Sequence, residues 1–113
     1  MADYSQAAQL QNMNVAVIGP TVLVAGQVGY SVVLIAAVLA AAGAVTVTFE
    51  DGDGTNRLGP MALGANGSLV LPESQLGWAR TGSGQSLSLL LSGVVQVGGS
   101  ITYRLVPDHY ASN

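Results

Sequence analysis

Three carboxylates lie close together at Glu50, Asp51 and Asp53, in the segment EDGDGTN. Calcium binds oxygen ligands at alternating positions of a loop, and Asp51, Asp53 and Thr55 follow that spacing. The rest of the EF-hand pattern is absent. Counted from Asp51, the sixth position is not glycine and the twelfth is not the glutamate that completes such a loop. Asp-Gly pairs are typical of tight hairpin turns. We therefore expect a solvated hairpin tip here and no metal site.

The other residues capable of chemistry do not match a known catalytic or phosphate-binding motif. The single histidine, His109, lies between Asp108 and Tyr110 near the end of the sequence. A Ser-His-Asp triad also needs a serine held beside it, and no GxSxG motif occurs, so a frayed terminus is the simpler interpretation. Residues 82–84 (GSG) and the pair Gly98-Gly99 lack the lysine and the strand–glycine–helix context of a phosphate loop, and both predict turns. We expect no catalytic residue, no cofactor and no enzyme activity.

Trp78 and Arg80 form the one pair of side chains suited to stacking on a ligand. An indole and a guanidinium can bind the face of a sugar or a base. Such a pair is more often a partly buried anchor at the edge of a core or an interface. A sugar-binding role remains an alternative, although a single aromatic residue offers little surface on which a sugar ring could stack.

Composition excludes several classes of protein. The 113 residues suffice for one domain, and 50% are apolar while only 8% are charged, against about 25% in most proteins. The absence of cysteine excludes disulfides and thiolate metal sites. Three arginines, no lysine and six acids give a net charge of −3. Because phosphate contacts require many cationic side chains, we expect no nucleic-acid partner.

The elements that would position these residues are strands. Apolar residues alternate with small polar ones, as in Val45, Val47 and Phe49, and turn signals recur every 8–12 residues. The sequence predicts an all-β fold, a small antiparallel β-sandwich or jelly-roll-like domain of about eight short strands. We expect turns at Gly19-Pro20 and at 26–29, 50–56 and 64–67. The predicted strands are 13–18, 21–25, 30–42, 44–49, 58–63, 68–71, a short one near 78–80, 87–91 and 101–105. This gives an N-terminal arm at 1–12, the sandwich at 13–107 and a C-terminal tail at 108–113.

Residues 30–49 are also long and apolar enough for a membrane-spanning helix. No Lys or Arg lies near either end of this segment, and the Val-Thr alternation at 44–49 fits a strand. The N-terminal residues have no basic region or apolar run of the kind found in a signal peptide. A small membrane protein is therefore the less favoured interpretation, and we expect no membrane partner.

The predicted outward positions of the strands are Thr, Ser, Ala, Asn and Gln. Edge strands of soluble sheets usually carry charges that block pairing with other chains, and a domain of this size leaves about a third of its surface exposed. Uncharged exposed surface usually marks an interface. We therefore expect a subunit of an assembly.

Three segments resemble a set of small virion proteins of tailed bacteriophages: AGAVTVTFEDGDG at 42–54, the stretch from GPMALGANG to SLLLSG at 59–93, and VGGSITYRLV at 97–106. The matching positions are strand and turn residues: Gly59, Pro60, Leu63, Ala65, Asn66, Gly67, Pro72, Leu76, Gly77, Thr81, Gly84, Leu87, Leu91, Ser92, Val97, Gly98, Gly99 and Tyr103.

The resemblance spans roughly residues 13–106. It implies a structural protein of the virion, a decoration (cement) protein that binds the major capsid protein on the outer surface of the head. It also implies a homo-oligomer, with a trimer favoured because it would match the local three-fold positions of the shell. The alternative is a carbohydrate- or receptor-binding module of a fibre or tail.

Overall fold

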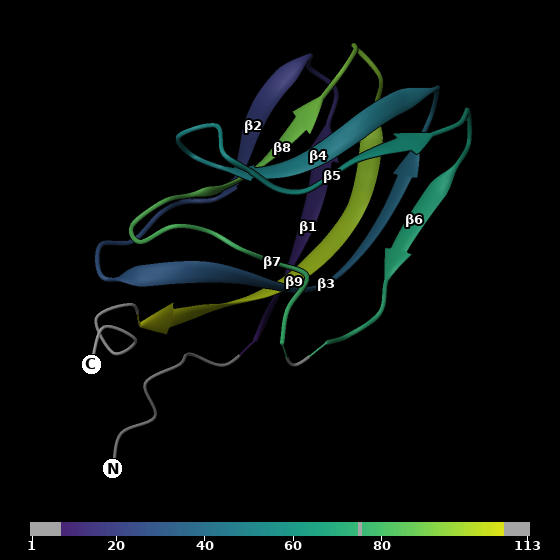
Figure 1. Ribbon diagram of the computed structural model, residues 1–113. Helices are drawn as coiled ribbons and strands as arrows, with labels where there is room; N and C mark the ends of the chain where they lie inside the picture. The colour runs from purple at the N-terminus through teal and green to yellow at the C-terminus, as the bar shows by residue number, and fades with distance from the viewer. Residues whose placement is uncertain (1–7, 75, 108–113) are drawn as a thin grey trace.

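The computed structural model describes residues 8–74 and 76–107, which form strands and contain no helix (Figure 1). The predicted all-β class is therefore confirmed, with nine strands where about eight were expected. The strands are β1 (Gln9–Val15), β2 (Gly19–Val24), β3 (Tyr30–Ala41), β4 (Val45–Asp51), β5 (Asn56–Leu63), β6 (Ser68–Leu71), β7 (Ala79–Arg80), β8 (Leu87–Leu91) and β9 (Val97–Pro107).

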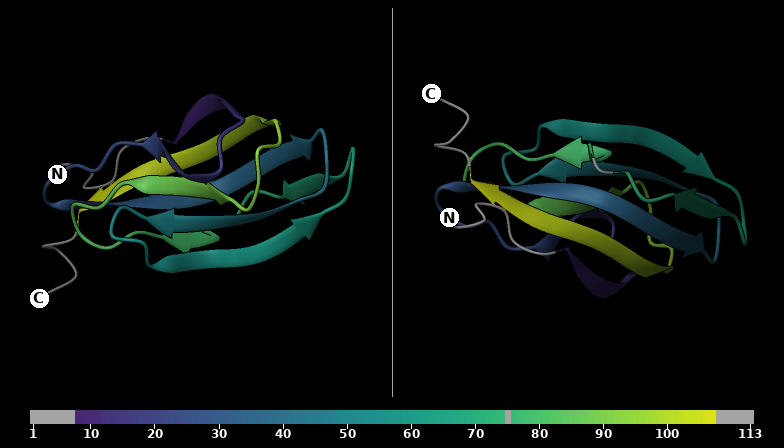
Figure 2. Two further views of the ribbon diagram at one scale, coloured as in Figure 1. Left: turned by 90° about the horizontal axis from the view of Figure 1, so that it is seen from above. Right: turned by 90° about the horizontal axis from the view of Figure 1, so that it is seen from below.

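The strands form two antiparallel sheets that lie face to face (Figure 2). One sheet has the order β1-β9-β3-β6, with β7 pairing beside β6 on β3, and the other has the order β2-β8-β4-β5. The chain can be followed as one long hairpin whose arms pair strand by strand: β1 with β9, β2 with β8, β3 with β6 and β7, and β4 with β5. Rolling this hairpin into two sheets gives the jelly roll.

The core lies between the sheets and is made by alternate residues of the strands. The predicted inward residues of β4 and β8 are buried, and the largest of them, Phe49, is completely covered. From the β2-β8-β4-β5 sheet the core takes Leu23, Val45, Val47, Phe49, Leu63, Leu87, Leu89 and Leu91. From the other sheet it takes Met13, Val15, Val32, Leu34, Ala37, Leu39, Ala41, Leu71, Ala79, Val97, Ile101 and Leu105.

The long apolar run is a strand, as the alternation predicted. β3 covers Tyr30–Ala41, and β4 follows after a short turn. Within the described residues no helix is long and apolar enough to cross a membrane. The first half of β3 is buried on both faces, because the 72–78 connection covers Val33 and Ile35 from outside: the Ser74 N–H donates to the Ile35 carbonyl (3.0 Å), and a Cβ placed on Gly77 would lie 2.4 Å from Val33.

Two predicted turns are wrong. Gly19 and Pro20 begin β2, and the turn is at 16–18 instead. Proline is tolerated there because β2 is an edge strand, where a missing N–H need not break the ladder. Gly98 and Gly99 lie in β9, where a Cβ on Gly99 would come within 1.8 Å of the Val38 carbonyl oxygen. Glycine at this position allows β9 to pass close to β3.

The domain boundaries differ slightly from the prediction at the N-terminal side. β1 begins at Gln9, so residues 9–12, expected in the arm, belong to the sheet. β9 ends at Pro107, at the predicted end of the sandwich. Most of the predicted arm and the whole of the predicted tail, 108–113, lie outside the described residues.

Candidate functional site

The sandwich has two ends that differ in charge. The uncharged end consists of four loops: 16–18, 42–44, 64–67 and 92–96. The hairpin end consists of the connections 25–29, 52–55 and 81–86. In Figure 1 the uncharged end lies at the upper right and the hairpin end at the left. None of the four loops of the uncharged end contains an acidic or basic residue. The charged side chains of the described residues are Glu50, Asp51, Asp53, Arg57, Glu73, Arg80 and Arg104.

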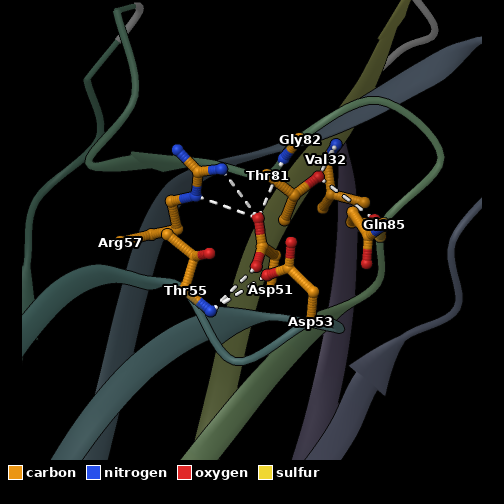
Figure 3. A network of polar contacts seen from close by, with 8 residues as sticks. All are labelled: Val32, Asp51, Asp53, Thr55, Arg57, Thr81, Gly82 and Gln85. Atoms are coloured by element: carbon orange, nitrogen blue, oxygen red, sulfur yellow. Dashed lines mark hydrogen bonds and ion pairs between the residues drawn. The ribbon is translucent and has the colours of Figure 1, made fainter.

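Asp51 is the centre of a polar network at the hairpin end (Figure 3). Its side chain is fully buried, and its Oδ2 accepts hydrogen bonds from Arg57 Nη2 (2.8 Å), from Arg57 Nε (3.0 Å) and from the Gly82 N–H (3.2 Å). Its Oδ1 accepts the Thr55 N–H at 3.2 Å. Burial alone raises the pKa of Asp51, but hydrogen bonding with Asp53, Arg57 and Gly82 and the charge of Arg57 outweigh it and lower the pKa to about 2.

The expected solvated tip is thus only partly correct. Asp53 is exposed, but Asp51 has 1% of its surface exposed and Glu50 has 9%. The difference arises because Arg57 and the 81–82 backbone reach Asp51 from β5 and from a distant loop. Among the described residues, no group of three or more His, Cys, Asp or Glu side chains is placed to hold a metal ion. The carboxylate of Asp51 already accepts N–H donors on both oxygens, so its role in the arrangement is to fix the fold.

Thr81 completes this network and ties the two sheets together. Its Oγ1 accepts the Val32 N–H (2.9 Å) and donates to the Gln85 carbonyl (3.1 Å). The adjacent Gly82 is bonded to Asp51. Since Val32 belongs to β3 and Asp51 to β4, the 81–86 loop is bonded to both sheets at once (Figure 3).

Trp78 behaves as an anchor. Its indole N–H donates to the Pro72 carbonyl (2.7 Å), and its backbone N–H donates to the Leu34 carbonyl (2.7 Å). The backbone bond holds the 72–78 connection on β3, and the indole bond joins the two ends of this connection, so the polar group of the indole serves the fold. Arg80 follows in the short strand β7, as predicted, and its side chain is exposed.

The other residues singled out in the sequence add no chemistry. Residues 82–84 form the predicted turn, closed by the Gln85 N–H bonded to the Gly82 carbonyl (3.0 Å). His109, Asp108 and Tyr110 lie outside the described residues.

Five of the exposed large apolar side chains lie at the uncharged end and on the adjoining outer face of the β1-β9-β3-β6 sheet, while others, such as Val28 and Leu76, lie elsewhere on the described surface. Val17, Ile18 and Val94 in the loops expose 56%, 62% and 76% of their surface. On the outer face, Val38 and Val70 are paired across β3 and β6 and are also exposed. These residues make a surface suited to contact with protein rather than with water.

A groove of about 550 Å³ lies on the outer face of the β2-β8-β4-β5 sheet. Thr46, Thr48 and Glu50 follow one another along β4, and Leu90 of β8 and Pro60 of β5 lie beside them. The full lining is Ile18, Gly19, Thr46, Thr48, Glu50, Asn56, Pro60, Leu90, Leu91 and Ser92.

The alternation that places Val45, Val47 and Phe49 on one face predicts Thr46, Thr48 and Glu50 on the other, as the structure shows, but it did not reveal a hollow there. Thr48 is 6% exposed and Glu50 is 9% exposed, which is unusual for an outer sheet face. The register of β5 on β4 shifts on both sides of Phe49. A bulge of this kind bends a strand, and no residue pattern marked it beforehand.

Comparisons of the chain with protein-family models, with curated proteins and with solved structures found no match. Function therefore has to be inferred from the fold and the surface.

Proposed function

We propose that the protein is a structural subunit of a tailed-bacteriophage virion, a decoration protein that binds the outside of the head shell and stabilises it. The jelly roll supports this proposal, because the fold is shared by viral capsid and lectin domains. Since one fold can serve many functions, the fold alone does not identify the function, and the properties of the surface are needed as well.

The main support for the proposed function comes from the uncharged end. Cores of protein interfaces are depleted of charged residues, and contiguous exposed apolar surface is uncommon on monomers. Here four loops without an ionisable side chain present Val17, Ile18 and Val94 to the outside. The polar groups of the network around Asp51 lie at the opposite end and are bonded to one another. One end is suited to contact with another polypeptide, and the other carries the charged network beside a single exposed valine, Val28.

Attachment of such a subunit would stabilise a shell by linkage. A protein that binds only the assembled shell lowers the free energy of that state by mass action and leaves the disassembled state unchanged. The partner in this proposal is the major capsid protein. The subunit itself would be a homo-oligomer, with a trimer favoured, because closed symmetry is the rule for such assemblies and a trimer fits a three-fold position.

Two matched substitutions test the proposal. Val94→Glu places a charge in the uncharged end, at a side chain that is 76% exposed, and Val28→Glu places the same charge at the hairpin end, at a side chain that is 93% exposed. Neither side chain is buried, so both variants should fold. Shells of the parent phage stripped of the protein would be incubated with each variant and sedimented, and their resistance to heat and low salt compared.

We expect Val94→Glu to bind the shells at least tenfold more weakly than the unmodified chain, and Val28→Glu to bind unchanged. Shells that regain heat resistance with Val28→Glu but not with Val94→Glu would support the decoration role. Equal binding by all three proteins would contradict the proposed docking end, and no binding by any of them would contradict the function.

A further inference from the structure

Glu50 is the least expected residue of the groove. Its side chain is nine-tenths buried and lines the hollow. Across residues 8–74 and 76–107, however, no N–H or O–H group donates to its carboxylate and no cation pairs with it. Among the described residues, Glu50 is not one of those with a fully buried polar atom that lacks a partner, so its carboxylate oxygens reach the water in the groove. An unpaired carboxylate on a mostly buried side chain is therefore placed to accept a donor from a ligand that enters the groove.

The rest of the groove indicates the chemistry of that ligand. Thr46 and Thr48 lie on the same side of β4 as Glu50, so two hydroxyl groups lead to the carboxylate. The walls, formed by Leu90, Pro60 and neighbouring residues, are mostly apolar. An aliphatic stem that ends in a cation matches this arrangement, because Lys and Arg side chains cover apolar surface with the stem and keep the charge at the tip.

The cation has to come from another molecule. The chain has no lysine and three arginines. Arg57 is held by Asp51, and Arg80 and Arg104 also interact with other groups. A second copy of this chain therefore offers no uncommitted basic side chain from its described residues. The volume of about 550 Å³ falls within the range of ligand sites and has room for a short segment of chain. None of the lining residues is an aromatic platform for a sugar ring.

We propose that this groove binds an extended segment of a partner polypeptide that bears a lysine or arginine, with the stem against Leu90 and Pro60 and the charged group on Glu50. The site rests on the proposed function only for the identity of the partner, which would then be the capsid protein. Thr46 and Thr48 give hydrogen bonds to the bound segment.

A peptide titration followed by NMR tests the site without the virion. The probe is an acetylated and amidated pentapeptide, TVKVT, and its counterpart has norleucine in place of lysine, which keeps the stem and removes the charge. Glu50→Gln removes the carboxylate charge from the groove. Glu73→Gln is the matched control, because it makes the same change at an exposed glutamate in the 72–78 connection.

We expect saturable shifts of the amide signals of Thr46, Thr48 and Glu50 with the lysine peptide. The dissociation constant should rise about tenfold in Glu50→Gln and with the norleucine peptide, and it should be unchanged in Glu73→Gln. Melting of Glu50→Gln should be no lower than that of the unmodified chain, which separates a loss of binding from a loss of folding.

The proposal would be overturned if ~20 mM lysine peptide left the groove signals unshifted, or if Glu50→Gln and Glu73→Gln bound it equally. Shifts of the same signals with chitotriose but not with the peptide would also overturn it, in favour of a sugar site. Because the titration needs no shells, a failure of shell binding with a successful titration would refute the virion role alone.

Discussion

Replacing Asp51 by asparagine removes a buried negative charge from the hairpin end and keeps the size of the side chain. The new amide has one oxygen and one NH2 group, whereas the carboxylate accepts donors on both oxygens. One side of the amide must therefore face N–H donors of Arg57, Gly82 or Thr55. We expect the protein to fold with reduced stability.

The magnitude follows from the pKa of Asp51, which is lowered from its ordinary value of 3.8 to about 2. Each pKa unit between the unfolded and folded states corresponds to ~1.4 kcal/mol, so the ionised carboxylate contributes about 2 kcal/mol to the free energy of unfolding at neutral pH. The mispaired NH2 group costs a further ~1 kcal/mol. For a domain of this size a loss of this order lowers Tm by roughly 10 °C or more.

The pH dependence has a definite sign. Since the pKa of Asp51 is lower in the folded state, the contribution of the charge is complete well above pH 3.8 and is lost as the pH falls from about 3.8 towards 2. The asparagine introduced by Asp51→Asn has no group that titrates in this range. The stability difference between the two proteins should therefore shrink by about 2 kcal/mol between pH 6 and pH 2, as measured by urea unfolding at each pH and one protein concentration.

Glu73→Gln is the control, because it removes the same charge from an exposed side chain and should change stability by less than ~0.5 kcal/mol. A difference between the Asp51→Asn variant and the unmodified chain that stays constant from pH 6 to pH 2 would refute this account of the network. An equal loss in Glu73→Gln would show that net charge, and not the buried network, sets the stability.

Two further predictions concern the core and the strand crossing. Val47→Asp or Leu89→Asp should prevent folding, because both side chains have no exposed surface and each substitution would bury an unpaired charge at a cost of several kcal/mol; soluble variants with a native circular dichroism spectrum would show that the strand faces are assigned wrongly. Gly99→Ala should lower Tm strongly, because its Cβ would lie 1.8 Å from the Val38 carbonyl oxygen, whereas Gly93→Ala, with nothing within 4 Å, should have little effect; equal melting of the two would contradict the close crossing of β9 and β3.

The sequence predicted the strands well because their signals are local. The Val-Thr alternation of β4 and the glycines and aspartates after it mark a hairpin without reference to the rest of the chain. Gly19-Pro20 misled for the opposite reason: the pair is typical of turns, and only the position of β2 at a sheet edge allows it to begin a strand.

The candidate site could not be predicted because it depends on distant residues. Asp51 is buried by the Gly82 amide, thirty-one positions along the chain. Glu50 lines a groove whose other wall comes from Leu90 of β8. The alternation in β4 placed Glu50 on the outer face correctly, but whether that face is flat or hollow is set by the bulge of β5 at Gly59-Pro60, opposite Thr48, and by pairing with β8.

The first strand of the domain lies beside the last one. β1 pairs with β9 along its whole length, from Gln9 opposite Tyr103 to Val15 opposite Val97, and β9 separates β1 from β3. Since a ribosome makes the chain from its N-terminus, β1 has no pairing partner until residues 97–107 have emerged, and until then β3 is paired only on its β6 and β7 side. Closure of this sheet therefore waits for the synthesis of β9, and a chain truncated before residue 97 should be degraded or aggregate rather than accumulate as a folded fragment.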